Sequence, residues 1–115
     1  MYVEVMMKYN MDLYKLKADI SKAFSDPKRL MIISELRDGE KSVGELVDAL
    51  DISQAVISRE LGILRARGVV KPRRDGNNIY YSVTSPRICE ACDIVHEVLL
   101  EHLAQNKEMA ESLLK

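Results

Sequence analysis

Residues 53–65 carry hydrogen-bonding, cationic and small apolar side chains around an apolar stripe of Ile57, Leu61 and Leu64. Glutamine can bond adenine and arginine can bond guanine, each through two hydrogen bonds, and valine can meet the thymine methyl group. The candidates for contact with DNA bases lie off the stripe: Ser53, Gln54, Val56, Ser58, Arg59 and Arg65. The alternative is an ordinary solvated helix face.

A second group of polar side chains lies just beyond, at a predicted hairpin. Two arginines precede a turn-forming cluster at residues 75–78, Asp-Gly-Asn-Asn. Residues 53–83 hold six basic and two acidic side chains, net +4, in a chain of net charge −1. This distribution favours contact of the hairpin with backbone phosphate or the minor groove. The candidates are Arg73, Arg74, Asn77 and Asn78. The alternative is a hairpin that only covers the edge of the core.

Two helical patterns with only two residues between them must position the first group. Ser42 and Glu45 form a capping box at the start of the first pattern. Its apolar face then contains Val43, Leu46, Val47 and Leu50. Ser53 is a suitable N-cap for the second pattern, and Gly68 ends it. The spacing predicts a helix-turn-helix over residues 42–68, an arrangement that inserts its second helix into a DNA major groove.

The remaining elements frame this helix-turn-helix. An amphipathic helix is expected over residues 12–24, and Asp26-Pro27 begins another. Residues 69–83 change to a period of two and predict a two-stranded wing, in which Pro72 requires an edge or a strand end. The predicted fold is mainly α with a β-hairpin wing. It is a single winged helix-turn-helix domain over residues 1–115, with about five helices and two strands.

The last predicted helix, residues 85–114, begins at Ser85-Pro86 and has a wide apolar face. Its apolar side chains recur at steps of three and four residues: Ile88, Cys92, Val95, Leu99 and Leu103. We expect the helices at 12–24 and 85–114 to form a homodimer, which presents two recognition helices to two half-sites of double-stranded DNA. The alternative is that both helices pack onto their own core.

The composition argues against several other classes of protein. The 115 residues are 47% apolar and 30% charged, and charges interrupt every apolar run before the about 20 residues of a membrane span. The N-terminus lacks the pattern of a signal peptide, so a cytoplasmic protein without a membrane partner is expected. No nucleophile–base set or phosphate-binding glycine loop is evident, so we expect neither an enzyme nor a cofactor. A winged-helix module for protein–protein contact is the rival class.

Cys89 and Cys92 lie one turn apart near the start of the last predicted helix. The positive end of the helix dipole favours thiolates there, which can close a disulfide or capture a metal or persulfide. His96 lies on the same face and could add a third metal ligand, although zinc would need a fourth. Buried cysteines also pack as small apolar groups. Redox-active, metal-binding and inert thiols are therefore three open alternatives.

Three stretches of the chain carry a family resemblance: AFSDPKRL at residues 23–30, the second helical pattern with its exit at residues 53–70, and the predicted hairpin at residues 73–81. Together they resemble the ArsR/SmtB family of bacterial and archaeal repressors. Residues 23–30, AFSDPKRL, resemble its A-x-x-D-P-x-R-L entry, and residues 53–70 are similar to its recognition helix and the exit into the wing. Arg73-Arg74-Asp75-Gly76 with Ile79-Tyr80-Tyr81 resembles its wing. The likeness covers roughly residues 12–103. It implies a homodimeric repressor that binds operator DNA, is released by an inducer and dimerises through its first and last helices.

The chain departs from the family pattern at its metal-binding and recognition positions. Glu60 stands where members of the family often carry histidine. Ser42-Val43-Gly44 replaces the Cys-x-Cys of the metal-sensing branch, so the resemblance implies no soft-metal site there. Asp93, His96 and His102 are of the types that the zinc branch uses in its last helix, but their spacing does not match. The resemblance therefore supports a DNA-binding regulator and leaves its signal open.

Overall fold

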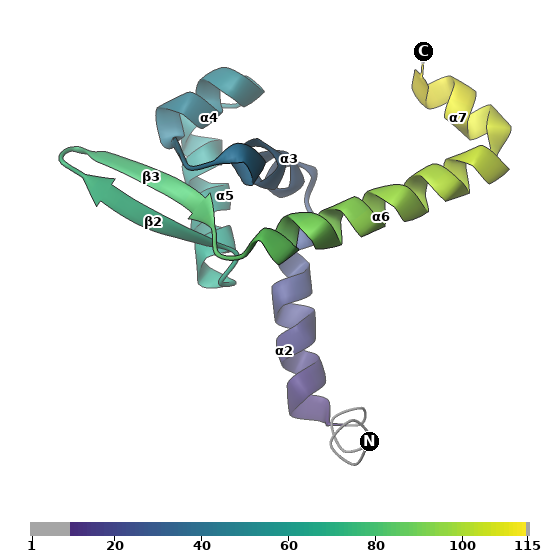
Figure 1. Ribbon diagram of the computed structural model, residues 1–115, viewed down its shortest axis with the longest axis horizontal. Helices are drawn as coiled ribbons and strands as arrows, with labels where there is room; N and C mark the ends of the chain where they lie inside the picture. The colour runs from purple at the N-terminus through teal and green to yellow at the C-terminus, as the bar shows by residue number, and fades with distance from the viewer. Residues whose placement is uncertain (1–9, 115) are drawn as a thin grey trace. The chain divides into compact units, whose positions relative to one another are not determined.

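The computed structural model describes residues 10–114 and contains two compact units, Met1–Thr84 and Ser85–Lys115 (Figure 1). Residues 1–9 and 115, which the predicted domain includes, lie outside the described part of the chain. The first unit contains the predicted helix-turn-helix and wing. The described residues of the second unit form two helices. Within residues 10–114, no helix is long and apolar enough to cross a membrane.

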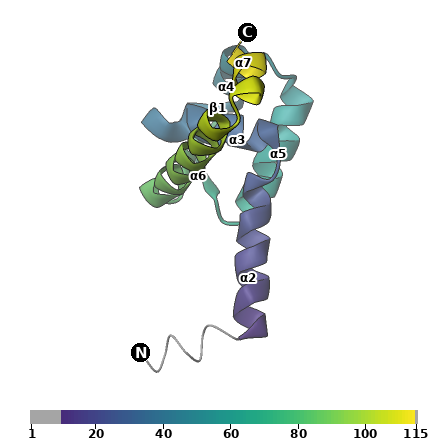
Figure 2. The ribbon, with the colours of Figure 1, turned by 90° about the vertical axis from the view of Figure 1, so that its right-hand side faces the viewer.

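The helices of the first unit are α2 (Met11–Ser21), α3 (Pro27–Glu35), α4 (Val43–Leu50) and α5 (Gln54–Ala66), with 3-10 turns η1 (Lys22–Phe24) and η2 (Leu36–Asp38). Helices α3, α4 and α5 pack against one another (Figure 2). Their fully buried side chains form the core together with Val69: Ile32, Ile33, Leu36, Leu46, Ile57, Leu61 and Leu64. The predicted helix over residues 12–24 is thus an α-helix that tightens into a 3-10 turn.

Side-chain caps fix where these helices begin, as the sequence predicted. Ser42 accepts a hydrogen bond from the amide of Glu45 at 3.1 Å, and the Glu45 carboxylate accepts one from the amide of Ser42 at 3.1 Å. Ser53 accepts from the amide of Val56. Asp26 accepts from the amide of Lys28 at 2.8 Å. Desolvation opposes ionisation of Asp26, but the amides of Lys28 and Arg29 outweigh it and hold the pKa of this carboxyl below its usual value.

The wing is a three-stranded antiparallel sheet rather than the predicted two-stranded hairpin. Strand β3 (Asn78–Val83) lies between β2 (Val70–Asp75) and β1 (Lys41–Ser42). The additional strand lies just before α4, where Lys41 pairs with Tyr81 and Ser42 pairs with Tyr80. A two-residue strand is too short to show an alternating pattern, so backbone pairing alone reveals it. Pro72 lies in β2 at the sheet edge, as its missing N–H requires.

The second unit contains two helices instead of the single predicted helix over residues 85–114. Helix α6 (Pro86–Gln105) is capped by Ser85, which accepts from the amide of Arg87 at 3.2 Å. Asn106 leaves the helical region with φ −114° and ψ 82°, and α7 (Lys107–Leu114) follows. Asparagine competes for backbone hydrogen bonds and is a poor residue for a helix interior, which accounts for a break at this position.

Candidate nucleic-acid interface

The outer face of α5 holds most of the side chains that the sequence predicted for base contact. Its opposite face buries Ile57, Leu61 and Leu64 completely. The predicted residues Ser53, Gln54, Ser58, Arg59 and Arg65 are exposed, whereas Val56 is half-buried and contributes less surface than expected. The amphipathic spacing thus turns a row of hydrogen-bonding groups toward solvent.

Small residues complete this outer face, and the sequence analysis did not single them out. Ala55, Gly62 and Ala66 are exposed on α5. A Cβ added at Gly62 would meet no heavy atom within 4 Å, so no packing within the described chain requires glycine there. Glycine in a helix interior costs about 1 kcal/mol relative to alanine. The small residues leave open space on the exposed face of α5 that also carries Arg59, and their helical spacing opposite the apolar stripe could have identified them.

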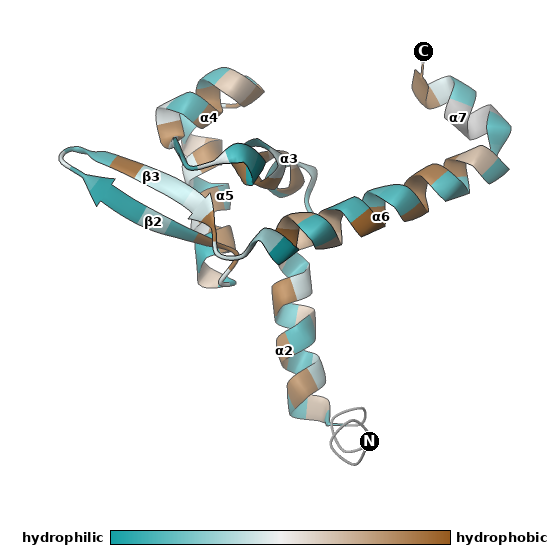
Figure 3. Cartoon of the chain, in the orientation of Figure 1, coloured by the Kyte–Doolittle hydropathy of each residue, from teal (hydrophilic) through white to brown (hydrophobic). Residues whose placement is uncertain are grey.

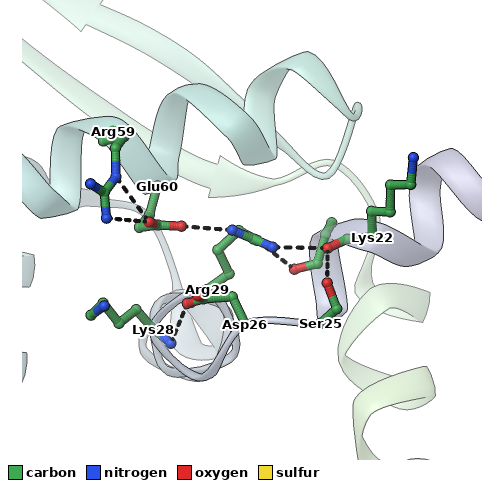
Figure 4. A network of polar contacts seen from close by, with 8 residues as sticks. Lys22, Ser25, Asp26, Lys28, Arg29, Arg59 and Glu60 are labelled. Carbon is green, nitrogen blue, oxygen red and sulfur yellow. Dashed lines mark hydrogen bonds and ion pairs between the residues drawn. The ribbon is translucent and has the colours of Figure 1, made fainter.

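Arg59 is the exposed end of a polar network that reaches the interior (Figure 4). Its Nε and Nη2 donate to one carboxylate oxygen of Glu60, Oε1, at 3.3 and 3.1 Å. The side chain of Glu60 is only 3% exposed, whereas that of Arg59 is 63% exposed. Glu60, which stands where members of the family that the chain resembles often carry histidine, therefore lies on the core side of α5 and not on its outer face.

Arg29, from α3, occupies the other side of the Glu60 carboxylate. Its Nη1 donates to Oε2 of Glu60 at 2.8 Å. Its Nε and Nη2 donate to the carbonyl oxygens of Ala23 and Lys22 at 3.1 and 3.0 Å. All three nitrogens of this guanidinium are engaged (Figure 4). The sequence analysis quoted Arg29 only as part of a motif, and no sequence signal links it to Glu60.

Arg73 lies on the edge strand β2, a strand that is hydrophilic over most of its length (Figure 3). Its Nε donates to Oε2 of Glu40 at 2.9 Å, and its Nη2 donates to Oε1 of the same carboxylate. The guanidinium also lies 5.0 Å from the centre of the Tyr80 ring. The hydrogen bonds with Glu40 raise the pKa of Arg73 and hold the pKa of the Glu40 carboxyl below its usual value. Glu40 is a second residue that sequence reasoning missed.

The tip of the wing presents the other predicted residues without such pairing. Arg74 is exposed, and its side chain makes no hydrogen bond or ion pair with any residue in the described range 10–114. Asn77 and Asn78 are exposed at the turn, where Gly76 has φ +62°, a left-handed conformation that favours glycine. Because successive strand residues point to opposite faces, Arg73 and Arg74 serve different sides of the hairpin.

The two thiols belong to α6, in the second unit. Cys89 is buried and Cys92 is half-buried, so the residue that the sequence placed on the apolar stripe is the more accessible one. No disulfide joins them. His96 is exposed. Within the described part of the chain, no three His, Cys, Asp or Glu side chains form a group that could hold a metal ion.

A model for the bacterial regulatory proteins of the arsR family matches residues 26–71. An HTH-type transcriptional regulator of Mycobacterium tuberculosis, Rv0081, is 38% identical over 102 residues, which cover 88% of this chain and 90% of that protein. Its crystal structure matches with a TM-score of 0.75 over 84% of this chain and 98% of that one. A biofilm growth-associated repressor of Xylella fastidiosa is 37% identical over 79% of this chain and 77% of that protein.

A third similar protein is known as a homodimer. The winged helix-turn-helix DNA-binding domain of Mb0332 from Mycobacterium bovis, solved as a homodimer in solution, is 29% identical with a TM-score of 0.74. The match covers 82% of this chain and 87% of that domain. These proteins are regulators rather than enzymes, in agreement with the sequence prediction. The fold and the relatives together establish that this chain belongs to the ArsR family of winged helix-turn-helix transcriptional regulators.

Proposed function

We propose that this chain is a homodimeric repressor that binds operator DNA through α5 and the wing, and that thiol chemistry at Cys89 and Cys92 changes its affinity. The exposed row of Gln54, Ser58 and Arg59 opposite the buried stripe of α5 carries the DNA-binding part of the proposal. An α-helix fits the major groove of DNA, and side chains of these types can hydrogen-bond the base edges there. Because its partner is chromosomal DNA, we propose that the protein acts in the cytoplasm.

The contribution of the wing is supported by charge and exposure. Arg74, Asn77 and Asn78 are exposed at its tip, and Arg73 is half exposed on the same strand. Arginines and amides at a hairpin tip suit the phosphate backbone and the minor groove beside a bound recognition helix. The phosphate contacts among them add affinity without selecting a sequence. The wing would therefore hold α5 in place while α5 reads the bases.

The homodimer is supported by apolar surface on α2 and α6. Large apolar side chains of both helices are exposed in the single chain: Met11, Leu16, Ile20, Ile94, Val95, Val98, Leu99 and Leu100. Brown, hydrophobic segments recur along α6 (Figure 3). Large apolar side chains exposed along each of these helices favour a partner, and the homodimeric structure of Mb0332 supports a second copy. Sedimentation tests this directly, since a mass of one chain at micromolar concentration would contradict the dimer.

Repression is supported by the name of the Xylella fastidiosa relative, a repressor. A dimer seated on an operator that overlaps a promoter would exclude the polymerase. The thiol part rests on the position of Cys89 and Cys92 in the first two turns of α6. An oxidant that takes two electrons from the two thiols, with loss of both protons, would leave a disulfide across one helical turn. That bond distorts the helix that we assign to the dimer interface.

The main alternative for these cysteines is that they are inert and only pack as small apolar groups. The burial of Cys89 favours that alternative. A metal-responsive regulator would need ligands beyond Cys89, Cys92 and His96, for example from a second copy. The two alternatives differ from the redox proposal in what changes operator affinity. Oxidant acts only through reactive thiols, and zinc acts only through ligands.

The test is fluorescence anisotropy of the purified protein on a duplex from its own promoter, in reductant, after mild oxidant and with added zinc. We expect salt-sensitive binding that changes on oxidation and recovers with reductant. The matched control is the double variant Cys89→Ser/Cys92→Ser, which should bind alike in every condition. An unchanged oxidant response in this variant would contradict the thiol proposal. Absence of salt-sensitive binding to any promoter fragment would contradict DNA binding and favour a protein–protein module.

A further inference from the structure

We propose that Glu60 is a specificity-determining positioning residue that orients the guanidinium of Arg59 for contact with DNA. Arg29 in turn fixes the orientation of the Glu60 carboxylate. This inference rests on the proposed DNA binding of α5. It adds a role for a buried carboxylate that does not itself face the partner. Arg59 is the group that would touch DNA, and Glu60 would act through it.

The geometry of Arg59 and Glu60 is not one that a helix gives by default. Neighbouring residues on a helix point about 100° apart and do not face each other. Here the Nε and Nη2 of Arg59 nevertheless reach a single oxygen of Glu60, the next residue in the chain. The contact survives with 63% of the Arg59 side chain exposed, so burial of Arg59 does not hold it. The carboxylate is the group that directs it.

Glu60 can direct Arg59 only if the carboxylate itself cannot turn, and Arg29 meets that condition. The bond from Arg29 Nη1 to Glu60 Oε2 is 2.8 Å and is nearly buried, with 12% and 3% of the two side chains exposed. Arg29 is in turn held by the carbonyl oxygens of Lys22 and Ala23. Charge-assisted bonds of this kind are the strong ones in proteins. This series of hydrogen bonds runs from the carbonyl oxygens of η1 through Arg29 of α3 to Glu60 of α5. It therefore fixes the position of the other carboxylate oxygen of Glu60, Oε1, which Arg59 contacts.

The donors that Glu60 does not use are the ones that suit DNA. A guanidinium has five N–H donors in one plane. Glu60 takes the side of Arg59 that is formed by Nε and Nη2, which leaves the Nη1 donors and the second Nη2 donor directed away from the carboxylate. That remaining edge can bond a guanine or a phosphate through two parallel hydrogen bonds. A fixed guanidinium favours one such partner, whereas an unrestrained one would accept phosphate anywhere.

The charge of Glu60 has a second effect on the same contact. Two guanidinium groups share this one carboxylate, so a cation still faces the exterior, but the nearby anion weakens its attraction for phosphate in general. The weaker attraction for phosphate mainly lowers the non-specific affinity, because non-specific binding is almost wholly electrostatic. A base contact that depends on geometry keeps its advantage. Glu60 would therefore raise the ratio of specific to non-specific affinity while lowering non-specific affinity itself.

The test compares the wild type, Glu60→Gln, Arg59→Gln and the double variant on a promoter duplex and on a shuffled duplex of equal composition, over a series of salt concentrations. For Glu60→Gln we expect tighter binding to shuffled DNA and a promoter-to-shuffled ratio that falls about tenfold. Arg59→Gln should lower the ratio to a similar degree and reduce the salt slope by about 1. The double variant should lose no more specificity than Arg59→Gln alone, because Glu60 would act through Arg59.

A purely structural role for Glu60 gives a different result. Glu60→Gln would then weaken binding to both duplexes in proportion and leave their ratio unchanged, which overturns the inference, as do additive losses in the double variant. Arg59→Lys is the second probe, since residue 59 is exposed and its substitution leaves the core intact. It should keep the salt slope and still lose specificity, and an unchanged ratio there overturns the inference. A wild type that binds no DNA would overturn the proposed function as well.

Discussion

The recognition helix and the wing each join an exposed arginine to a carboxylate of the same chain, but only one of the two carboxylates is buried. Arg59 and Arg73 are similarly accessible, with 63% and 53% of their side chains exposed. Their partners differ, since Glu60 is 3% exposed and Glu40 is 38% exposed. Glu60 also has a second cation on its far oxygen, Arg29. The Glu60 carboxylate is fixed from the interior, whereas among residues 10–114 the Glu40 carboxylate is bound only by Arg73.

Because of this difference in burial, one carboxylate can orient its arginine, whereas the other can only compete for its arginine with other anions. A buried and doubly bound carboxylate has a single orientation, so its exposed partner inherits one. An exposed carboxylate is screened by water and salt, and it can release its partner at little cost. Glu60 would therefore set where Arg59 points, whereas Glu40 would only compete with phosphate for Arg73. The same ion-pair chemistry would then serve two functions, and burial would decide between them.

The largest expected effect is on stability, and it tests the burial side of this comparison. Arg29→Ala leaves the Glu60 carboxylate buried without its inner partner and removes donors from two carbonyl oxygens. Breaking one side of a buried pair costs about 3–5 kcal/mol. Urea unfolding at neutral pH should show this loss in the free energy of unfolding.

Arg73→Ala is the matched control, because it removes an arginine from an exposed pair of the same kind. Its effect on unfolding should be far smaller, as is usual for exposed ion pairs. Equal losses in the two variants would mean that burial does not distinguish the pairs. The contrast between Glu60 and Glu40 would then fail.

Local parts of the fold could be predicted from the sequence because local rules determine them. The capping box of Ser42 and Glu45 and the stripe of Ile57 and Leu61 need only positions three or four residues apart. The exposure of Arg59 followed from the same period. The break at Asn106 is also local, but one asparagine inside a long amphipathic pattern is a weaker signal than the apolar repeat around it.

The partners of the two arginines could not be predicted, because tertiary packing brings them together. Arg29 and Glu60 are 31 positions apart, and Glu40 and Arg73 are 33 positions apart. Each pair exists only once α3 packs against α5, or once the segment before β1 lies beside the wing. A glutamate next to an arginine in a helix also looks like an ordinary solvated pair. The burial of Glu60 depends on how α5 is rotated about its own axis where it packs against α3. That rotation places residue 60 beside the buried apolar stripe of α5.

A smaller effect is expected when the exposed carboxylate is removed. Glu40→Gln should tighten DNA binding about two- to fivefold, because Arg73 then meets phosphate without first leaving an ion pair. The gain should be equal on promoter and shuffled duplexes, since phosphate contacts carry no sequence information. Anisotropy titrations on both duplexes measure it. Asp48→Asn removes the same charge from an exposed site on α4 and serves as the control. An equal gain in affinity from both variants would mean that Glu40 acts only through the net charge of the protein and not through its ion pair with Arg73.

The smallest effect is the pH dependence of the exposed pair. The pKa of Glu40 lies below its ordinary value of 4.5 because of its hydrogen bonds with Arg73. A carboxyl with a lowered pKa in the folded state stabilises that state above its ordinary pKa, and this contribution is lost as the pH falls through the folded value. The melting temperature of the wild type should therefore exceed that of Glu40→Gln by about 2 °C or less near neutrality. The gap should begin to narrow as the pH falls below about 4.5, should close once the pH is below the lowered pKa of Glu40, and should shrink in 1 M salt. A gap that persists at pH 3, or that salt does not reduce, would mean that Glu40 is held by something other than its exposed pairing with Arg73, and the distinction from Glu60 would lose its basis.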